Sequence, residues 1–374
     1  MRADQRSDSP TTIPAARESG PMLEDFAREL LWPKTLRMPA LALRPSRILL
    51  GIAGALLATI IGSIPLGDPD EPPIATVLSE RIGRFFSSVA ESAASLDPEG
   101  MLQETVEFAR FPGDLIMDRP WSTLLLAVPM ILTLALFGGA IARATAIEFA
   151  RTRFSEWPAD LRVSFRSLGA STGALIAPLV LVGAAVILIA GGGVLLGVPV
   201  LDLVGAALFG PAMLLALLGV LILMLHVLAL PMLVPALMVE GTDAFDAVQR
   251  CYAYVLARPL HLLLHGVTLL VLGAVSIGLF AALANGTDQL AIWSATRFAS
   301  ESGVEVLNGQ GDLTATQPAA ARIIAFYRSL TDLLVSGFAI SYFFAAGTTL
   351  YLVARRVCDG QDIHDLWDPP DAHA

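Results

Sequence analysis

Lysine, cysteine and charge of either sign are scarce in this chain, and the common reaction motifs are missing. Lys34 is the only lysine among 24 basic residues, and charged residues make up 16% of the 374. Cys251 and Cys358 are too few for a disulfide framework or a multi-cysteine zinc site. There is no HExxH, GxSxG, Walker, CxxC or paired-carboxylate pattern, so we expect no enzyme activity. No basic patch interleaved with aromatic residues occurs either, so we expect no nucleic-acid binding.

Long apolar runs dominate what is present. Residues 174–239 contain a single charged side chain, Asp202, and 55% of the whole chain is hydrophobic. Uncharged apolar stretches of about 18 residues or more are typical of membrane-spanning helices. The sequence therefore predicts an all-α fold, a polytopic transmembrane helical bundle surrounded by lipid.

Six apolar segments are long enough to cross a bilayer core of about 30 Å at about 1.5 Å per residue. They lie near residues 48–66, 121–141, 174–196, 211–239, 260–284 and 331–353. They divide the chain into a partly disordered leader (1–45), a bundle (46–357) with outer loops at 67–120 and 285–329, and an acidic, solvated tail (358–374).

The distribution of basic residues predicts the orientation. With six spans, 17 basic residues fall on the side of both termini and 7 on the other side. Because basic loops stay in the cytoplasm, we expect both termini there. Apolar residues at helical spacing, such as Leu78, Ile82, Phe85 and Val89 in the first outer loop, predict amphipathic interfacial helices.

A seven-span arrangement stays open, because residues 174–239 could cross the membrane three times. It would place 16 basic residues on one side and 8 on the other. We favour six spans because Gly210-Pro211 interrupts the run, and proline is common in the first turn of a helix. Residues 197–210 would then be a short outer segment.

Three histidines are the only candidates for chemistry inside the predicted spans. His226 lies in the fourth span, and His261 and His265 share one face of the fifth. Two imidazoles at this spacing can bind a metal, but no third ligand or acidic partner is visible in the sequence. We therefore expect no metal and no cofactor. We interpret His226 and His265 as interhelical hydrogen-bond partners and His261 as a side chain that reaches the membrane interface.

The segment that follows the fourth span has the most distinctive sequence, Glu-Gly-Thr-Asp-Ala-Phe-Asp-Ala from Glu240. Gly241 should end the span, and Thr242 or Asp243 should cap a cytoplasmic helix over residues 243–257. Phe245, Val248, Tyr252 and Val255 would form its apolar stripe. Candidate partner contacts on and beside this helix are Asp243, Asp246, Arg250, Tyr252 and Arg258.

This string resembles the E-G-[ST]-D-x-F-D-A helix, followed by Arg-Pro, of a family of uncharacterised bacterial multi-pass inner-membrane proteins. The Arg355-Arg356-Val-Cys-Asp-Gly-Gln-Asp sequence is similar to the family's basic stop and following turn. The resemblance covers about residues 140–368. It implies the topology and a location in the bacterial cytoplasmic (inner) membrane, and it implies no activity.

Three functional hypotheses follow. The first is a non-enzymatic scaffold or accessory component that contacts the lipid bilayer and a membrane or cytoplasmic protein partner through helix 243–257. The alternative is a transporter or permease subunit for an uncharged or lipid-like solute. An enzyme embedded in lipid, which would rest on the three histidines alone, is third.

Single cysteines placed at Thr242, Gly309 and Gln361, in a chain whose native cysteines are replaced by serine, test the topology. With six spans, a membrane-impermeant maleimide should label position 309 from outside intact cells, and positions 242 and 361 only after the cells are opened. Labelling of positions 242 and 361 from outside would show that the chain crosses seven times.

Overall fold

The computed structural model describes residues 35–66, 71–95, 97–311 and 314–368. All regular structure in these ranges is helical, which confirms the predicted all-α class. Six of the helices are long and apolar enough to cross a membrane, as predicted. They are α4 (Pro45–Gly62), α7 (Pro120–Arg151), α9 (Leu168–Leu195), α10 (Leu201–Glu240), α12 (Pro259–Thr296) and α14 (Gln317–Asp359). The chain is a multi-pass membrane protein.

Shorter helices connect these six. They are α3 (Met38–Ala42), α5 (Ile74–Ala94), α6 (Pro98–Asp118), α8 (Trp157–Arg166), α11 (Ala244–Ala257) and α13 (Glu301–Asn308). The predicted disorder at the start of the leader lies outside the described residues, whereas residues 35–45 contain α3.

Proline and glycine set many of these boundaries. Proline stands in the first turn of α4, α6, α7, α8, α12 and α14, where its missing N–H removes no helical hydrogen bond. Gly241, Gly309 and Gly360 end α10, α13 and α14 with positive φ angles, a backbone conformation that glycine adopts without strain.

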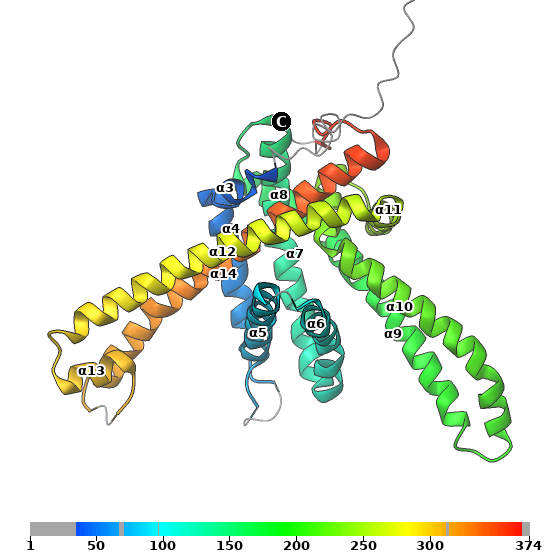
Figure 1. Ribbon diagram of the computed structural model, residues 1–374, viewed down its shortest axis with the longest axis horizontal. Coiled ribbons are helices and arrows are strands. Elements are labelled where there is room, and N and C mark those ends of the chain that lie inside the picture. The colour runs from blue at the N-terminus through cyan, green and yellow to red at the C-terminus, as the bar shows by residue number, and fades with distance from the viewer. Residues whose placement is uncertain (1–34, 67–70, 96, 312–313, 369–374) are drawn as a thin grey trace, which may run out of the picture.

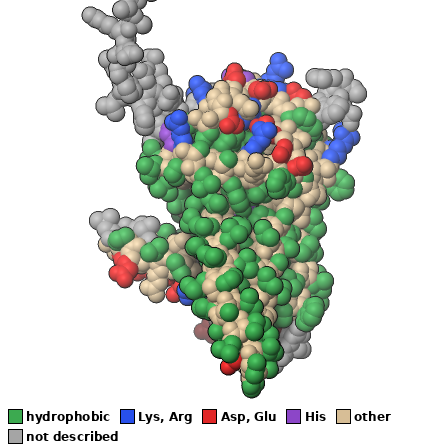
Figure 2. Space-filling model, turned by 90° about the vertical axis from the view of Figure 1, so that its right-hand side faces the viewer, with side chains coloured by type: hydrophobic (Ala, Val, Ile, Leu, Met, Phe, Trp, Pro, Cys, Tyr) green, Lys and Arg blue, Asp and Glu red, His purple; other side chains and the backbone are tan. Residues whose placement is uncertain are grey.

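The helices converge at one end and diverge at the other (Figure 1). Helices α4 and α7 pack side by side in the middle. The α9–α10 pair leaves them on one side and the α12–α14 pair on the other. Arginines and carboxylates gather at the converging end, and hydrophobic side chains cover the helices below it (Figure 2). We call this converging end, which contains Arg47, Glu148, Glu240 and Arg355, the charged end.

The buried core lies next to the charged end. Most of its members come from the halves of α7, α10 and α14 nearest to that end, together with α3 and the inner face of α11, and Ala174, Leu269 and Leu366 join them. Three of the long helices are mostly exposed: only 11% of the most apolar window of α9, 17% of α10 and 11% of α12 is buried within the protein. Such surfaces suit contact with lipid rather than water.

The fourth span differs from the prediction. Helix α10 runs without interruption from Leu201 to Glu240, so Gly210-Pro211 does not begin it and residues 197–210 are not a separate segment. Proline removes one backbone hydrogen bond, but water does not compete for the neighbouring bonds in an apolar environment. The turn between α9 and α10 instead falls at residues 196–200, where Val200 has a positive φ of 75°.

The two segments predicted to be outer loops are mostly helical rather than irregular. Residues 67–120 contain the paired helices α5 and α6, joined through Phe85 and Phe108, whose ring centroids are 4.4 Å apart. Helices α12 and α14 extend through much of the predicted loop 285–329, and Arg328 pairs with Asp288 at 3.0 Å. Helix α14 has 43 residues and is about 65 Å long, so it tilts in the bilayer or projects beyond it.

The tail also differs from the prediction of a solvated segment. Residues 361–368 fold back onto the charged end, where Ile363 and Leu366 are buried. These apolar residues alternate with the aspartates. The acidic composition of the tail therefore gave no sign that one side of it packs against the bundle.

The crossing of α4 and α14 provides a test of this packing. A Cβ atom at Gly51 would lie 2.1 Å from the backbone oxygen of Gly337, so the Gly51→Ala substitution forces two backbones apart. We expect a loss of about 1–3 kcal/mol, measured as a lower unfolding temperature in detergent. Gly278→Ala in α12 is the matched control, because its Cβ meets nothing within 4 Å. Equal unfolding temperatures for the two variants would contradict the crossing.

Candidate functional site

The most elaborate polar arrangement of the described residues lies at the charged end. Helix α10 ends at Glu240, and Gly241 has a φ of 65°. Asp243 then begins α11 by accepting a hydrogen bond from the Asp246 backbone N–H at 2.9 Å. The predicted end of the span, the Asp243 cap and the helix that follows it are therefore confirmed as local structure.

Glu240 holds three elements together. Its carboxylate lies 3.1 Å from a guanidinium nitrogen of Arg355 and 3.6 Å from one of Arg250. The Tyr351 hydroxyl donates a hydrogen bond to it at 3.0 Å. Arg355 is only 2% exposed, so Glu240 supplies the counter-charge that its burial requires. This one carboxylate therefore joins the end of α10 to the middle of α11 and the end of α14.

A second buried arginine joins α3, α4 and α7. Arg47 is 3% exposed and donates to the Leu41 carbonyl at 2.5 Å and the Ala144 carbonyl at 3.0 Å. It also pairs with Glu148 at 2.6 Å, and the more exposed Arg44 binds the same carboxylate at 2.7 Å. This pair anchors the start of the first span against the second.

Asp160 of α8 is the buried acid of the charged end. It is 2% exposed; one carboxylate oxygen accepts from the Ser155 hydroxyl at 2.7 Å, and the other has no hydrogen-bond partner among the described residues. Burial raises the pKa of Asp160 to about 6, although the Ser155 hydrogen bond and the charges of Arg143 and Arg47 oppose that rise. Asp160 therefore titrates near neutral pH.

The three histidines do not assemble into a site. The His226 Nδ1 atom lies 3.1 Å from the Tyr252 hydroxyl, which ties α10 to α11. The His265 Nδ1 atom lies 3.0 Å from the His261 carbonyl oxygen, so that nitrogen carries the proton, since a carbonyl only accepts. Among the described residues, no group of three histidine, cysteine, aspartate or glutamate side chains could hold a metal ion.

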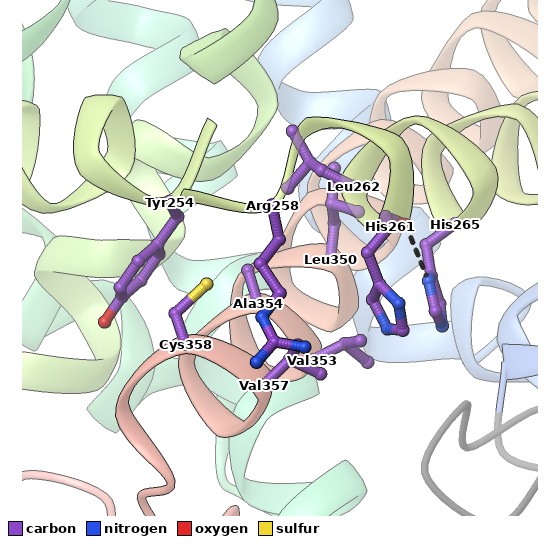
Figure 3. A pocket seen from close by; sticks show the side chains of 10 residues that line it. All are labelled: Tyr254, Arg258, His261, Leu262, His265, Leu350, Val353, Ala354, Val357 and Cys358. Atoms are coloured by element: carbon purple, nitrogen blue, oxygen red, sulfur yellow. Dashed lines mark hydrogen bonds between the residues drawn. The ribbon is translucent and has the colours of Figure 1, made fainter. Parts of the chain in front are cut away.

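A small hollow lies beside His261 and His265, between the start of α12 and the end of α14. Figure 3 shows Arg258 pointing into it between His261 and Cys358. It has room for about one water molecule, which is too little for a cofactor. The nearby Cys251 is fully buried, and burial raises the pKa of its thiol, so it stays protonated and unreactive at neutral pH.

The candidate partner contacts divide into two groups. Asp243, Asp246 and Arg258 are exposed and can be reached by another molecule. Arg250 and Tyr252 instead have internal partners, Glu240 and His226. Burial raises the pKa of Tyr252 to about 12, so the phenol stays protonated at neutral pH.

The predicted apolar stripe of α11 is partly wrong. Phe245 is 76% exposed, and the side chains that face the bundle are Ala247, Cys251, Tyr254 and Val255. Helix α11 rests on the ends of α9, α10 and α14 with this narrower face. Phe245 therefore adds an exposed aromatic ring between the two acidic residues.

The sequence interpretation missed the buried charges Arg47, Arg143, Asp160 and Arg355. It counted the arginines only as loop charges that set orientation. A signal was available for Arg143, which lies between apolar and small residues at 138–142 and 144–147. An arginine within such a run needs internal acceptors.

The pH dependence of stability tests the buried state of Asp160. Because its folded pKa of about 6 exceeds the ordinary 3.8, the folded state binds the proton more tightly. Stability should therefore fall by about 3 kcal/mol as pH rises from about 4 to about 6, and no further above that. Asp160→Asn should remove this component, so that its unfolding temperature in detergent rises relative to wild type with increasing pH.

Asp332→Asn, which removes an exposed carboxylate, controls for the loss of one negative charge. A constant difference in unfolding temperature between wild type and Asp160→Asn from pH 4 to pH 7.5 would show that Asp160 is not buried as described.

No family model, curated protein or solved structure matches this chain. The likeness of the Glu240–Pro259 segment to bacterial inner-membrane proteins therefore stays a prediction from the residues.

Proposed function

We propose that this protein is a non-enzymatic scaffold or accessory component of the bacterial cytoplasmic (inner) membrane that holds a protein partner on α11. The exposed side of that helix carries this proposal. Phe245 and Leu256 are 76% and 65% exposed, although the opposite side of the helix is fully packed. A rigid helix with an exposed aromatic ring is a common feature of binding surfaces.

The charge of this surface defines the chemistry of the partner. Asp243 and Asp246 flank Phe245 and are exposed, whereas Arg250, the arginine within α11, is paired with Glu240. The free charge beside the ring is therefore negative. The partner should present an apolar pocket surrounded by basic side chains.

The arginines support the proposed orientation. Arg44, Arg47, Arg143, Arg151, Arg250, Arg258, Arg355 and Arg356 all belong to the charged end or to helices that begin there. Basic residues mark the cytoplasmic side of inner-membrane proteins, so α11 faces the cytoplasm.

Partner capture with matched phenylalanine variants tests the scaffold proposal. The tagged full chain, extracted in mild detergent, should retain a cytoplasmic or membrane protein that Phe245→Ala retains at least about tenfold less, since the ring supplies the apolar contact. Phe298→Ala, at an exposed ring outside α11, should retain the same amount as wild type. Equal recovery with both variants, or recovery of the tagged chain alone, would contradict the proposal.

Transport of a lipid-like solute is a second candidate, favoured by the apolar helix faces. The α9–α10 and α12–α14 pairs diverge from the central helices (Figure 1), and most of the apolar surface of α9, α10 and α12 is uncovered. A lipid-like molecule could move along such faces without a polar cavity. If so, liposomes that contain the protein should exchange a fluorescent phospholipid between leaflets faster than empty liposomes; equal rates would remove this candidate.

A further inference from the structure

Residues 361–368 lie in a groove built by the ends of three helices. Helix α14 ends at Gly360, and residues 361–368 then cross the ends of α7, α10 and α14. Ile363 and Leu366 are 3% and 5% exposed, and Leu366 belongs to the main hydrophobic core. Only Gly360 lies between α14 and this docked segment.

Three arginines hold the backbone of the segment. Arg355 donates to the Asp365 carbonyl at 2.6 Å, Arg151 to the Leu366 carbonyl at 3.1 Å, and Arg143 to the Trp367 carbonyl at 2.5 Å. The Trp367 N–H donates in turn to the Val239 carbonyl at 2.9 Å. Backbone contacts of this kind bind a peptide by its conformation and are independent of its side chains.

Side chains at two positions add selectivity. The Trp367 ring occupies the space that a side chain at Gly241 would need, since a Cβ there would lie 2.3 Å from the ring. Asp368 binds both terminal nitrogens of Arg151, at 2.9 and 2.8 Å, and one nitrogen of Arg143 at 3.3 Å. Two-pronged pairing of arginine with carboxylate is strong and geometrically specific.

We propose that this groove is a peptide-binding site whose resident ligand is the chain's own segment 361–368. A peptide of the same chemistry, with an apolar residue, two variable residues, a second apolar residue, a tryptophan and an aspartate, replaces that segment in the groove. The groove is built by α7, α10 and α14, so its binding does not require that α11 holds a partner.

Because the arginines are buried, we expect one peptide to replace another in the groove, and we do not expect the groove to stand empty. Arg143 and Arg355 are 3% and 2% exposed, and each directs hydrogen bonds at the segment. Arg143 also donates to the Met238 carbonyl and Arg355 also pairs with Glu240, but an empty groove would leave the donors that now bind the segment without those acceptors, which is unfavourable. The resident segment therefore leaves when a competing peptide supplies the same acceptors.

Binding of a synthetic peptide to the full chain tests the proposal. The probe is a fluorescein-labelled peptide of residues 360–374, and the measurement is fluorescence anisotropy in detergent. In wild type the tethered segment competes at an effective concentration of about a millimolar. A chain with Trp367→Ala and Asp368→Asn loosens its own segment, so it should bind the probe on the order of 100-fold more tightly than wild type does.

Asp362→Asn is the matched control, because the Asp362 side chain accepts a hydrogen bond only from the backbone of His364, within the segment itself. That variant should bind the probe as weakly as wild type. A probe that carries the same two changes as the loosened chain should bind none of the chains.

The milder Asp368→Asn variant keeps the test valid if the double variant does not fold. It retains the Trp367 contacts and should gain about tenfold in affinity for the probe, which would support a separable site. Well-folded Asp368→Asn or double-variant chains that bind the probe no better than wild type would overturn the proposal and make the segment an inseparable part of the fold.

Discussion

The structure depends on the burial of arginine among apolar helix ends. Arg47, Arg143 and Arg355 are each 2–3% exposed. A guanidinium cannot lose its charge at any relevant pH, so its burial is tolerated only where carboxylates and carbonyls surround it. Glu148, Glu240 and Asp368 meet this requirement, and each belongs to a different segment from the arginine that it binds. The need to satisfy three buried cations therefore brings distant segments to one place.

The same requirement explains why the helices are packed at one end and separated at the other. In lipid, apolar helix faces gain little by packing on one another, because the lipid tails solvate them equally well. Contacts then persist where polar groups need partners or where small residues let backbones approach. Gly347 shows the second case: a Cβ there would lie 2.0 Å from the Pro231 carbonyl. Beyond these points α9, α10 and α12 have no such contact to hold them against the central helices, and they diverge.

Much of the fold could be predicted from the sequence because it follows from the hydropathy of single helices and from the residues at their ends. Hydropathy along one helix sufficed for six spans, and Gly241 with Asp243 sufficed for the end of α10 and the start of α11. The pattern was misleading at Gly210-Pro211, since proline interrupts a helix less readily in lipid than in water. It was silent about Arg143 and Trp367, which lie 224 positions apart, because hydropathy does not indicate which segments meet.

Most polar groups of the charged end bind other groups of the same protein, which also limits how this end can contact other molecules. Glu240, Arg355, Tyr351, Glu148 and Arg47 bind one another or nearby carbonyls, Cys251 keeps its proton, and the hollow beside His261 has room for about one water molecule. These polar groups hold the ends of the helices together. The features left for contact with other molecules are surfaces: the acidic, aromatic side of α11 and the groove that now holds residues 361–368. The two meet at Gly241, whose position is fixed by Glu240 on one side and by Trp367 on the other. On these two proposals, a molecule that replaced the resident segment would move the Trp367 ring away from Gly241, which precedes α11, so occupation of the groove would be coupled to the orientation of that helix.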